Sequence, residues 1–122
     1  MGNDLNSVLI EGRLIADPHL LFAQSSGQEC RFVIACKRCY EKDDEHQEEV
    51  SCFHVSVFGR QGEVCHERLN KDRRVRVVGR LREKRCGREA GVYIIAEHVE
   101  IKPDREQGPA STGAETITIK PV

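Results

Sequence analysis

The stretch VSCFHVSVFGRQGEVCHERLNKDRRVRVVGRLREKR, residues 50–85, decides the fold. Its first nine residues carry apolar side chains at every second position, a period that is typical of a β-strand with one face in a core. The alternation then stops, and segment 61–70 places Val64 and Leu69 near one side of a short helix. A period of two returns at 73–85. The stretch therefore predicts a strand, a helix and a second strand.

The two strands of this stretch have different outer faces. The core face of the first strand consists of Phe53, Val55 and Val57. Its outer face is mixed and holds Cys52, His54, Ser56 and Phe58. One face of the second strand is formed by Val75, Val77, Gly79 and Leu81. The opposite face, interrupted by Val78, is a basic stripe made of Arg74, Arg76, Arg80, Arg82 and Lys84.

Segments on both sides of this stretch predict three more strands. They span residues 6–14, 30–38 and 92–101. Segment 41–49 contains six acidic residues, one Lys and no apolar residue, so we predict a solvated acidic loop there. Residues 104–122 are rich in Gly, Pro, Ser and Thr and read as a tail, although TITI at 116–119 could pair with an exposed strand edge.

The predicted order is strand, strand, strand, short helix, strand, strand. That is the order of an OB-fold, a partly open five-stranded barrel that binds oligonucleotides across one face. We therefore expect an all-β protein with a five-stranded OB-fold barrel in residues 1–103, one short helix between its third and fourth strands, and a C-terminal tail at 104–122. A small β-sandwich stays open as an alternative, because strand count alone does not fix topology.

The charge of the chain is separated along its length. The 122 residues contain 19 Lys and Arg against 20 Asp and Glu, a formal net charge of −1, with 39% hydrophobic residues. That composition fits one globular domain without a membrane span. Residues 60–88 contain eleven basic and four acidic residues, a net of +7, whereas 41–49 nets −5. Because exposed charges are screened beyond about 8 to 10 Å at physiological salt, a basic groove can attract phosphates locally on a neutral chain.

Basic residues beside aromatic rings are typical of proteins that bind single-stranded nucleic acid, because unpaired bases stack on the rings. Phe58 lies on the outer face of its strand, and His54 on the same face is expected to meet DNA or an interface. Tyr40 follows the second predicted strand, beside Lys37 and Arg38. We expect these residues and the basic stripe to form a binding site. Three other aromatic residues are expected to pack in the core or at the barrel ends: Phe22, Phe32 and Tyr93.

Metal binding and catalysis find little support. Cys36 and Cys39 form one Cys-x-x-Cys, without the second pair that zinc sites usually have, and residues three apart on a strand point to opposite faces. Cys65 and His66 are neighbours on the predicted helix, so their side chains point about 100° apart and cannot form a nucleophile–base pair. We expect no enzyme activity, no cofactor and no metal.

The six cysteines raise the question of compartment. They could form three disulfides, but the first residues lack the charged, apolar and small-residue order of an export signal. We therefore expect a cytoplasmic protein with reduced thiols and no membrane association.

Three long segments resemble bacterial single-stranded DNA-binding proteins. NSVLIEGRLIADPHL at 6–20 is similar to the opening strand and Asp-Pro turn of that family, and VYIIAEHVEI at 92–101 to its last strand. VSVFGRQGEVCHERLNKDRRVRVVGRLR at 55–82 resembles its strand three, helix and strand four. The likeness covers roughly residues 5–103. It implies an OB-fold, a nucleoid-associated homotetramer with DNA wrapped around it, and protection of single strands in DNA replication, recombination and repair.

The resemblance also implies roles for single residues. Tyr40 and Phe58 match stacking positions. The positions that contact phosphates match Arg60, Lys84 and Arg85.

This sequence departs from the family at several points. Two stacking positions, often aromatic in the family, fall on Cys52 and Cys86, and the chain has no Trp, which predicts weaker stacking and a larger electrostatic share. Asp72 stands where the family tends to have Gly, a left-handed position that Asp can adopt at some cost. The family's Gly-rich linker and acidic tip, which recruit replication and repair proteins, are replaced by TITIKPV, so such recruitment is in doubt.

Other functions stay open. An OB-fold adaptor in replication, of the primosomal type, or a binder of single-stranded RNA shares the same features. A purely structural oligomer could instead pair its basic stripe with the acidic loop of a neighbouring copy.

Overall fold

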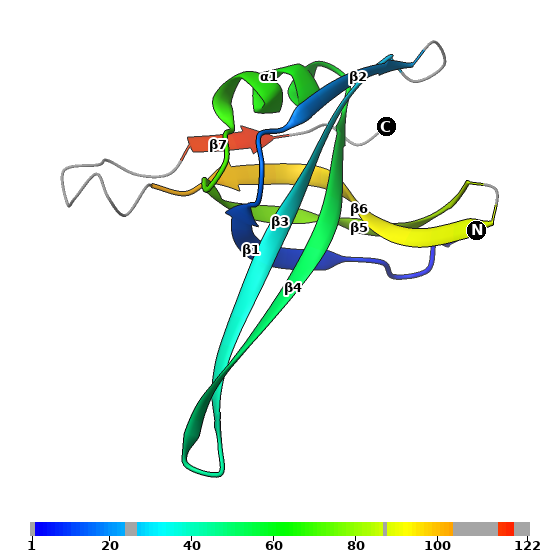
Figure 1. The fold of residues 1–122 in the computed structure, drawn as a ribbon. Helices are drawn as coiled ribbons and strands as arrows, with labels where there is room; N and C mark the ends of the chain where they lie inside the picture. Colours follow the sequence, from blue (N-terminus) through cyan, green and yellow to red (C-terminus); the bar gives the residue numbers. More distant parts are fainter. Residues whose placement is uncertain (1, 24–26, 87, 104–114, 119–122) are drawn as a thin grey trace.

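The chain folds into a barrel of β-strands with one short helix (Figure 1). The structure is a computed structural model that describes residues 2–23, 27–86, 88–103 and 115–118. Side chains at 23, 85, 86, 89, 90 and 115–118 lie outside this description. The elements in chain order are β1 Val8–Leu14, β2 His19–Ala23, β3 Gly27–Lys42, β4 Glu45–Phe58, α1 Arg60–Arg68, β5 Arg74–Cys86, β6 Glu89–Ile101 and β7 Glu115–Thr118.

Five strands close the barrel. β1 pairs antiparallel with both β3 and β5, β5 pairs with β6, and β3 pairs with β4. A short parallel pairing between β4 and β6 completes the ring. Gly12 allows β1 to meet two partners, because a Cβ there would lie 2.5 Å from the carbonyl oxygen of Ala35 on β3. The barrel and the helix that follows β4 confirm the predicted all-β barrel with one short helix.

The barrel interior is filled by aliphatic side chains from all five strands. Leu14, Ile34, Val57, Val77 and Ile101 are each at most 1% exposed. The inner side of α1 packs on this core through Val64 and Cys65, and Leu69, the extended residue that follows the helix, is buried in the same core. The predicted side of the helix is thereby confirmed.

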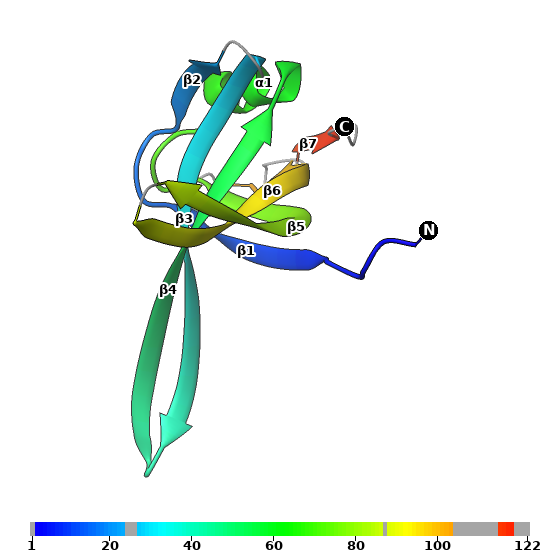
Figure 2. The same ribbon diagram turned by 90° about the vertical axis from the view of Figure 1, so that its right-hand side faces the viewer.

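Residues 41–49, predicted as a solvated loop, form instead the end of a long hairpin arm that projects from the barrel (Figures 1 and 2). β3 and β4 stay paired as far as Lys42 and Glu45. The chain reverses at Asp43 and Asp44, whose φ angles are 54° and 63°. Two left-handed residues make the tight hairpin turn whose twist matches that of the flanking strands. Both faces of the arm tip meet solvent, so the sequence lacks the apolar alternation that would have marked these strands.

Three further features differ from or extend the sequence predictions. β2 was not predicted, and it pairs with β3 along its whole length. β7 pairs with β6 at His98–Ile101, which confirms the predicted strand-edge pairing for residues 116–118 of TITI; residue 119 lies outside the described residues. Phe53, predicted on the core face, is 37% exposed. Phe53 lies on β4 where the strand passes from the barrel into the arm, so its ring is exposed to solvent.

The connection from α1 to β5 turns at Asp72, which adopts the left-handed φ of 73° expected at this position. Its N–H donates to the carbonyl oxygen of Leu14 at 2.9 Å. The preceding N–H, of Lys71, donates to a carboxylate oxygen of Asp17 at 2.8 Å. These bonds tie the connection to the end of β1.

The described cysteines are free thiols, as predicted. Cys30 and Cys65 are fully buried in the core, and burial raises the pKa of each thiol to about 12. Cys39 and Cys52 are exposed on the arm and at its base. The buried thiols therefore behave as small apolar core residues.

Candidate nucleic-acid interface

A groove of about 600 Å³ lies between the outer face of β3 and β4, the hairpin of β5 and β6, and the connection from β1 to β2. Its polar and aromatic lining includes His19, Arg31, His54, Ser56, Lys84 and Tyr93. The remaining lining is mainly apolar, with side chains such as Val33, Val55 and Val92. Its volume is in the range of sites that hold a small organic ligand.

The strand register sets which side chains meet on the groove floor. Arg31 on β3 pairs with His19 of β2 on one side and with Ser56 of β4 on the other. In the next row, Val33 pairs with His54. Directly paired residues point to the same face of a sheet, so these residues share the outer face. Of the predicted site residues, His54 is thus placed in the groove.

A buried carboxylate holds the arginine of this floor. Arg31 Nε donates to Glu29 Oε2 at 2.6 Å, and Arg31 Nη2 donates to Oε1 at 3.3 Å. The Ser56 hydroxyl donates to the same Oε2 at 2.9 Å. Burial raises the pKa of Glu29, but the hydrogen bonds from Arg31 and Ser56 and the charges of Arg31 and Lys84 outweigh it and lower the pKa. Glu29 therefore stays ionised, although only 7% of the residue is exposed.

The β5–β6 hairpin forms the opposite wall. Lys84 Nζ lies 5.8 Å from the ring centroid of Tyr93, within the range of a cation–π interaction. The wall combines one cation with one aromatic ring, which is the combination that binds a phosphate and stacks a base. Tyr93, expected to pack in the core or at a barrel end, lines the groove instead.

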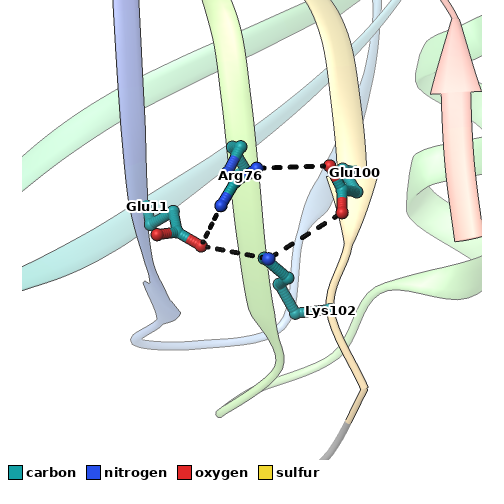
Figure 3. A network of polar contacts seen from close by, with 4 residues as sticks. All are labelled: Glu11, Arg76, Glu100 and Lys102. Carbon is teal, nitrogen blue, oxygen red and sulfur yellow. Dashed lines mark hydrogen bonds and ion pairs between the residues drawn. The ribbon is translucent and has the colours of Figure 1, made fainter. Parts of the chain in front are cut away.

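One residue of the predicted basic stripe, Arg76, lies away from the groove in a network of opposite charges (Figure 3). Arg76 Nη2 lies 3.2 Å from Glu11 Oε1, and Arg76 Nη1 lies 3.8 Å from Glu100 Oε2. Lys102 Nζ contacts the same two carboxylates at 3.4 and 3.8 Å. Burial raises the pKa of Glu11, but the charges and hydrogen bonds of Arg76 and Lys102 outweigh it and lower the pKa. The charges of two cations and two carboxylates cancel in this network, which therefore has no net charge.

The stripe runs on along β5, but its neighbours on β6 change where the register shifts. The pairing of β5 with β6 slips between Val78 and Gly79. Before the shift, Arg76 lies in the network of Figure 3, and Arg74 lines a second cavity at the base of the arm. Just after it, Arg80 Nη1 lies 3.4 Å from Glu97 Oε1. Arg82 follows as an exposed residue, and Lys84 reaches the groove.

The arm separates one group of predicted residues from the groove. Tyr40 pairs with Gln47 and is 38% exposed, with the guanidinium carbon of Arg38 5.7 Å from its ring centroid. Lys37 Nζ lies 3.3 Å from Glu48 Oε2. These side chains do not line the groove. Arg38 and Tyr40 share one face of the arm, whereas Lys37 lies on the opposite face and lines the cavity at the base of the arm.

The remaining predicted residues whose side chains are described are not among those that line the groove. Phe58 pairs with Glu29 and is half-buried on the same outer face. Arg60 is exposed at the first position of α1. Arg85 lies on β5, but its side chain falls outside the described residues.

The groove contains residues that the sequence did not single out. Arg31 lies within a predicted strand. Ser56 is 25 positions further along the chain on another strand, and nothing in the sequence indicates that the two residues meet. His19 belongs to the strand that was not predicted. The one available signal was the spacing of Glu29 and Arg31, which places opposite charges on the same face of an extended strand.

Two absences hold for the part of the chain that the structure describes. No group of three or more His, Cys, Asp or Glu side chains gathers where it could hold a metal ion. No helix in the same residues is long and apolar enough to cross a membrane.

Comparison with known proteins places the chain among proteins of one kind. The model of the single-strand binding protein family matches residues 5–102. The single-stranded DNA-binding protein of Treponema pallidum is 40% identical over 102 residues, covering 80% of this chain and 58% of that protein. The protein of the same name from Aquifex aeolicus is 32% identical over 123 residues, covering 97% of this chain and 83% of the relative. The chain thus spans little more than half of its Treponema relative.

Solved structures share the fold. The SSB of Plasmodium falciparum in complex with ssDNA superposes with a TM-score of 0.68 at 17% identity, covering 98% of this chain and 99% of that one. A deletion mutant of the single-stranded DNA binding protein of Thermus aquaticus gives a TM-score of 0.67 at 22% identity. It covers 80% of this chain and 56% of that one. Both likenesses support the OB-fold barrel.

Proposed function

The chain belongs to the single-strand binding protein family, and on that premise we propose that it binds single-stranded DNA without strong sequence preference. The groove over β3 and β4 carries this proposal, because Lys84 of the β5–β6 wall lies there beside the ring of Tyr93 and an apolar surface. Bases stack on such surfaces whatever their identity, while cations attract the phosphates that follow. No catalytic step is part of the proposed role.

The proposed contacts differ in weight. Lys84 and His54 act from within the groove, and Phe58 extends its stacking surface on the same face. The arm offers a second contact through Tyr40. We expect smaller contributions from cations that already face carboxylates. The supporting residues are Arg38, Arg60, Arg74, Arg82 and Arg85, and those expected to contribute less are Lys37, Arg76 and Arg80.

We also propose that the protein works as a homotetramer in the cytoplasm, at the nucleoid, protecting single strands in replication, recombination and repair. Family membership supports this role. The binding unit is assigned to residues 1–103 and the tail to 104–122. A net charge of −1 per chain makes assembly useful, because several grooves brought together can hold one strand that a single groove holds weakly. We propose replication and repair proteins as further partners.

Titration with oligo-dT at several salt concentrations tests the proposal. We expect micromolar or tighter binding whose logarithm falls linearly with the logarithm of salt concentration. A parallel titration with oligo-U distinguishes a preference for RNA, and native mass measurement with and without oligo-dT gives the assembly. Undetectable binding of both oligonucleotides at low salt would refute the proposal and favour an adaptor or a structural oligomer.

A further inference from the structure

The arginine on the groove floor, Arg31, is paired with a carboxylate, unlike the unpaired cation of a simple phosphate site. The guanidinium of Arg31 is bound through two of its nitrogens to Glu29, its buried neighbour on the same face of β3. The two charges cancel, and the lowered pKa of Glu29 keeps the cancellation in place at neutral pH. A phosphate approaching this point meets a carboxylate as well as a guanidinium. Arg31 therefore offers little net charge to a polyanion.

The shape of the same group suits a base. A guanidinium is planar, stacks on ring systems and is less strongly hydrated than an ammonium. The Arg31 side chain is 46% exposed and lines the groove. Its hydrogen bonds to Glu29 fix its position, and the Ser56 hydroxyl donates a hydrogen bond to the same carboxylate. Fixing the group in advance reduces the entropy lost on binding. We propose, on the premise of the function above, that Arg31 is a stacking platform for a base of the bound strand.

The position of Phe58 supports this assignment. Phe58 pairs directly with Glu29, so Arg31, two residues further along β3, is its diagonal neighbour on the same face. Diagonal neighbours across an antiparallel pair lie about 7–8 Å apart, which leaves room for one base between the ring and the guanidinium. The chain has no Trp and few aromatic residues, so a fixed guanidinium supplies stacking surface that would otherwise be scarce.

Two variants separate stacking from a phosphate contact. The first combines Arg31→Met with Glu29→Gln, which removes one positive and one negative charge together. The second, Arg31→Lys, keeps the charge and a partner for Glu29 but loses the planar group. Each is titrated with oligo-dT and with an abasic oligonucleotide of equal length, which has the same phosphates and no bases. The control is Arg68→Ala, an exposed arginine on α1 that does not line the groove.

Stacking predicts that both variants bind oligo-dT about fivefold or more weakly than the parent chain. Both should bind the abasic oligonucleotide within about twofold of the parent, with an unchanged salt slope, because no net charge is lost. The control should match the parent on both probes. Equal losses on the two probes, or parental binding of oligo-dT by Arg31→Lys, would overturn the inference and leave the proposed function standing. Absence of oligo-dT binding by the parent chain would overturn the proposed function itself.

Discussion

Replacing Arg76 by alanine should affect the stability of the barrel and leave DNA binding almost unchanged. Arg76 belongs to a basic stripe that the sequence alone assigns to DNA, yet its guanidinium faces Glu11 at 3.2 Å and Glu100 at 3.8 Å (Figure 3). The side chain is 39% exposed, so solvent screens both contacts. Partly exposed ion pairs contribute about 0.2–1 kcal/mol each, and two of them give a loss of about 0.5–2 kcal/mol.

The matched variant is Lys84→Ala, which removes a cation from the groove wall. Each phosphate neutralised on a single strand contributes about 0.7 to the slope of log affinity against log salt, so this variant should lower the slope by about that amount per contact. Arg76→Ala should keep the parental slope, because the charge it removes is already balanced by carboxylates. Urea unfolding at fixed protein concentration should show the reverse order, with the larger loss for Arg76→Ala.

The salt slope and the free energy of unfolding together test whether Arg76 serves stability and Lys84 serves DNA binding. A slope that falls as much for Arg76→Ala as for Lys84→Ala would show that DNA also runs over the β1–β5–β6 face. It would refute the assignment of Lys84 to DNA binding and of Arg76 to stability. Parental stability of Arg76→Ala would refute the energetic part of the reasoning.

Three further predictions concern other parts of the molecule. Phe58→Ala and Tyr40→Ala should each weaken oligo-dT binding by about 1–3 kcal/mol without altering the native mass, and parental affinity of both variants would refute their stacking role. Glu29→Gln should lose about 1.5–3 kcal/mol at neutral pH by urea unfolding. Because the pKa of Glu29 is lowered in the folded state, its contribution to the free energy of unfolding is present above the unfolded pKa and is lost as pH falls through the folded pKa. The difference in unfolding free energy between the parent and Glu29→Gln should therefore shrink in acid. A difference that does not change with pH would contradict this. A thiol reagent should modify exposed Cys52 in the native protein and leave Cys65, whose pKa burial raises to about 12, unmodified in the mass spectrum until the protein unfolds.

Several parts of the fold follow from local pattern. The period of two in 50–58 and 73–85, and its interruption between them, predicted β4, α1 and β5 in their correct order. The pattern failed at the arm, because alternation is visible only where one face of a strand is buried. Both faces of the arm tip meet solvent, so its acidic residues looked like a loop.

The candidate site was predictable only in part. Periodicity places His54 and Lys84 on outer faces, and the structure brings both into one groove. It also placed Arg76 and Lys84 on one face of β5, but the structure puts Arg76 in an ion-pair network with two carboxylates and Lys84 in the groove.

The amino-acid sequence by itself determined that this is an all-β domain with one helix, and that cations line one face of β5; closure of the strands into a barrel is seen only in the tertiary structure. The tertiary structure decided which of those cations have acidic partners. Glu11 and Glu100 reach Arg76 from two other strands, and Ser56 reaches Glu29 from across the hairpin. Alternation along a strand reports the face of a side chain, whereas its neighbours depend on the register with strands far away in the chain. That register is fixed only when the barrel closes.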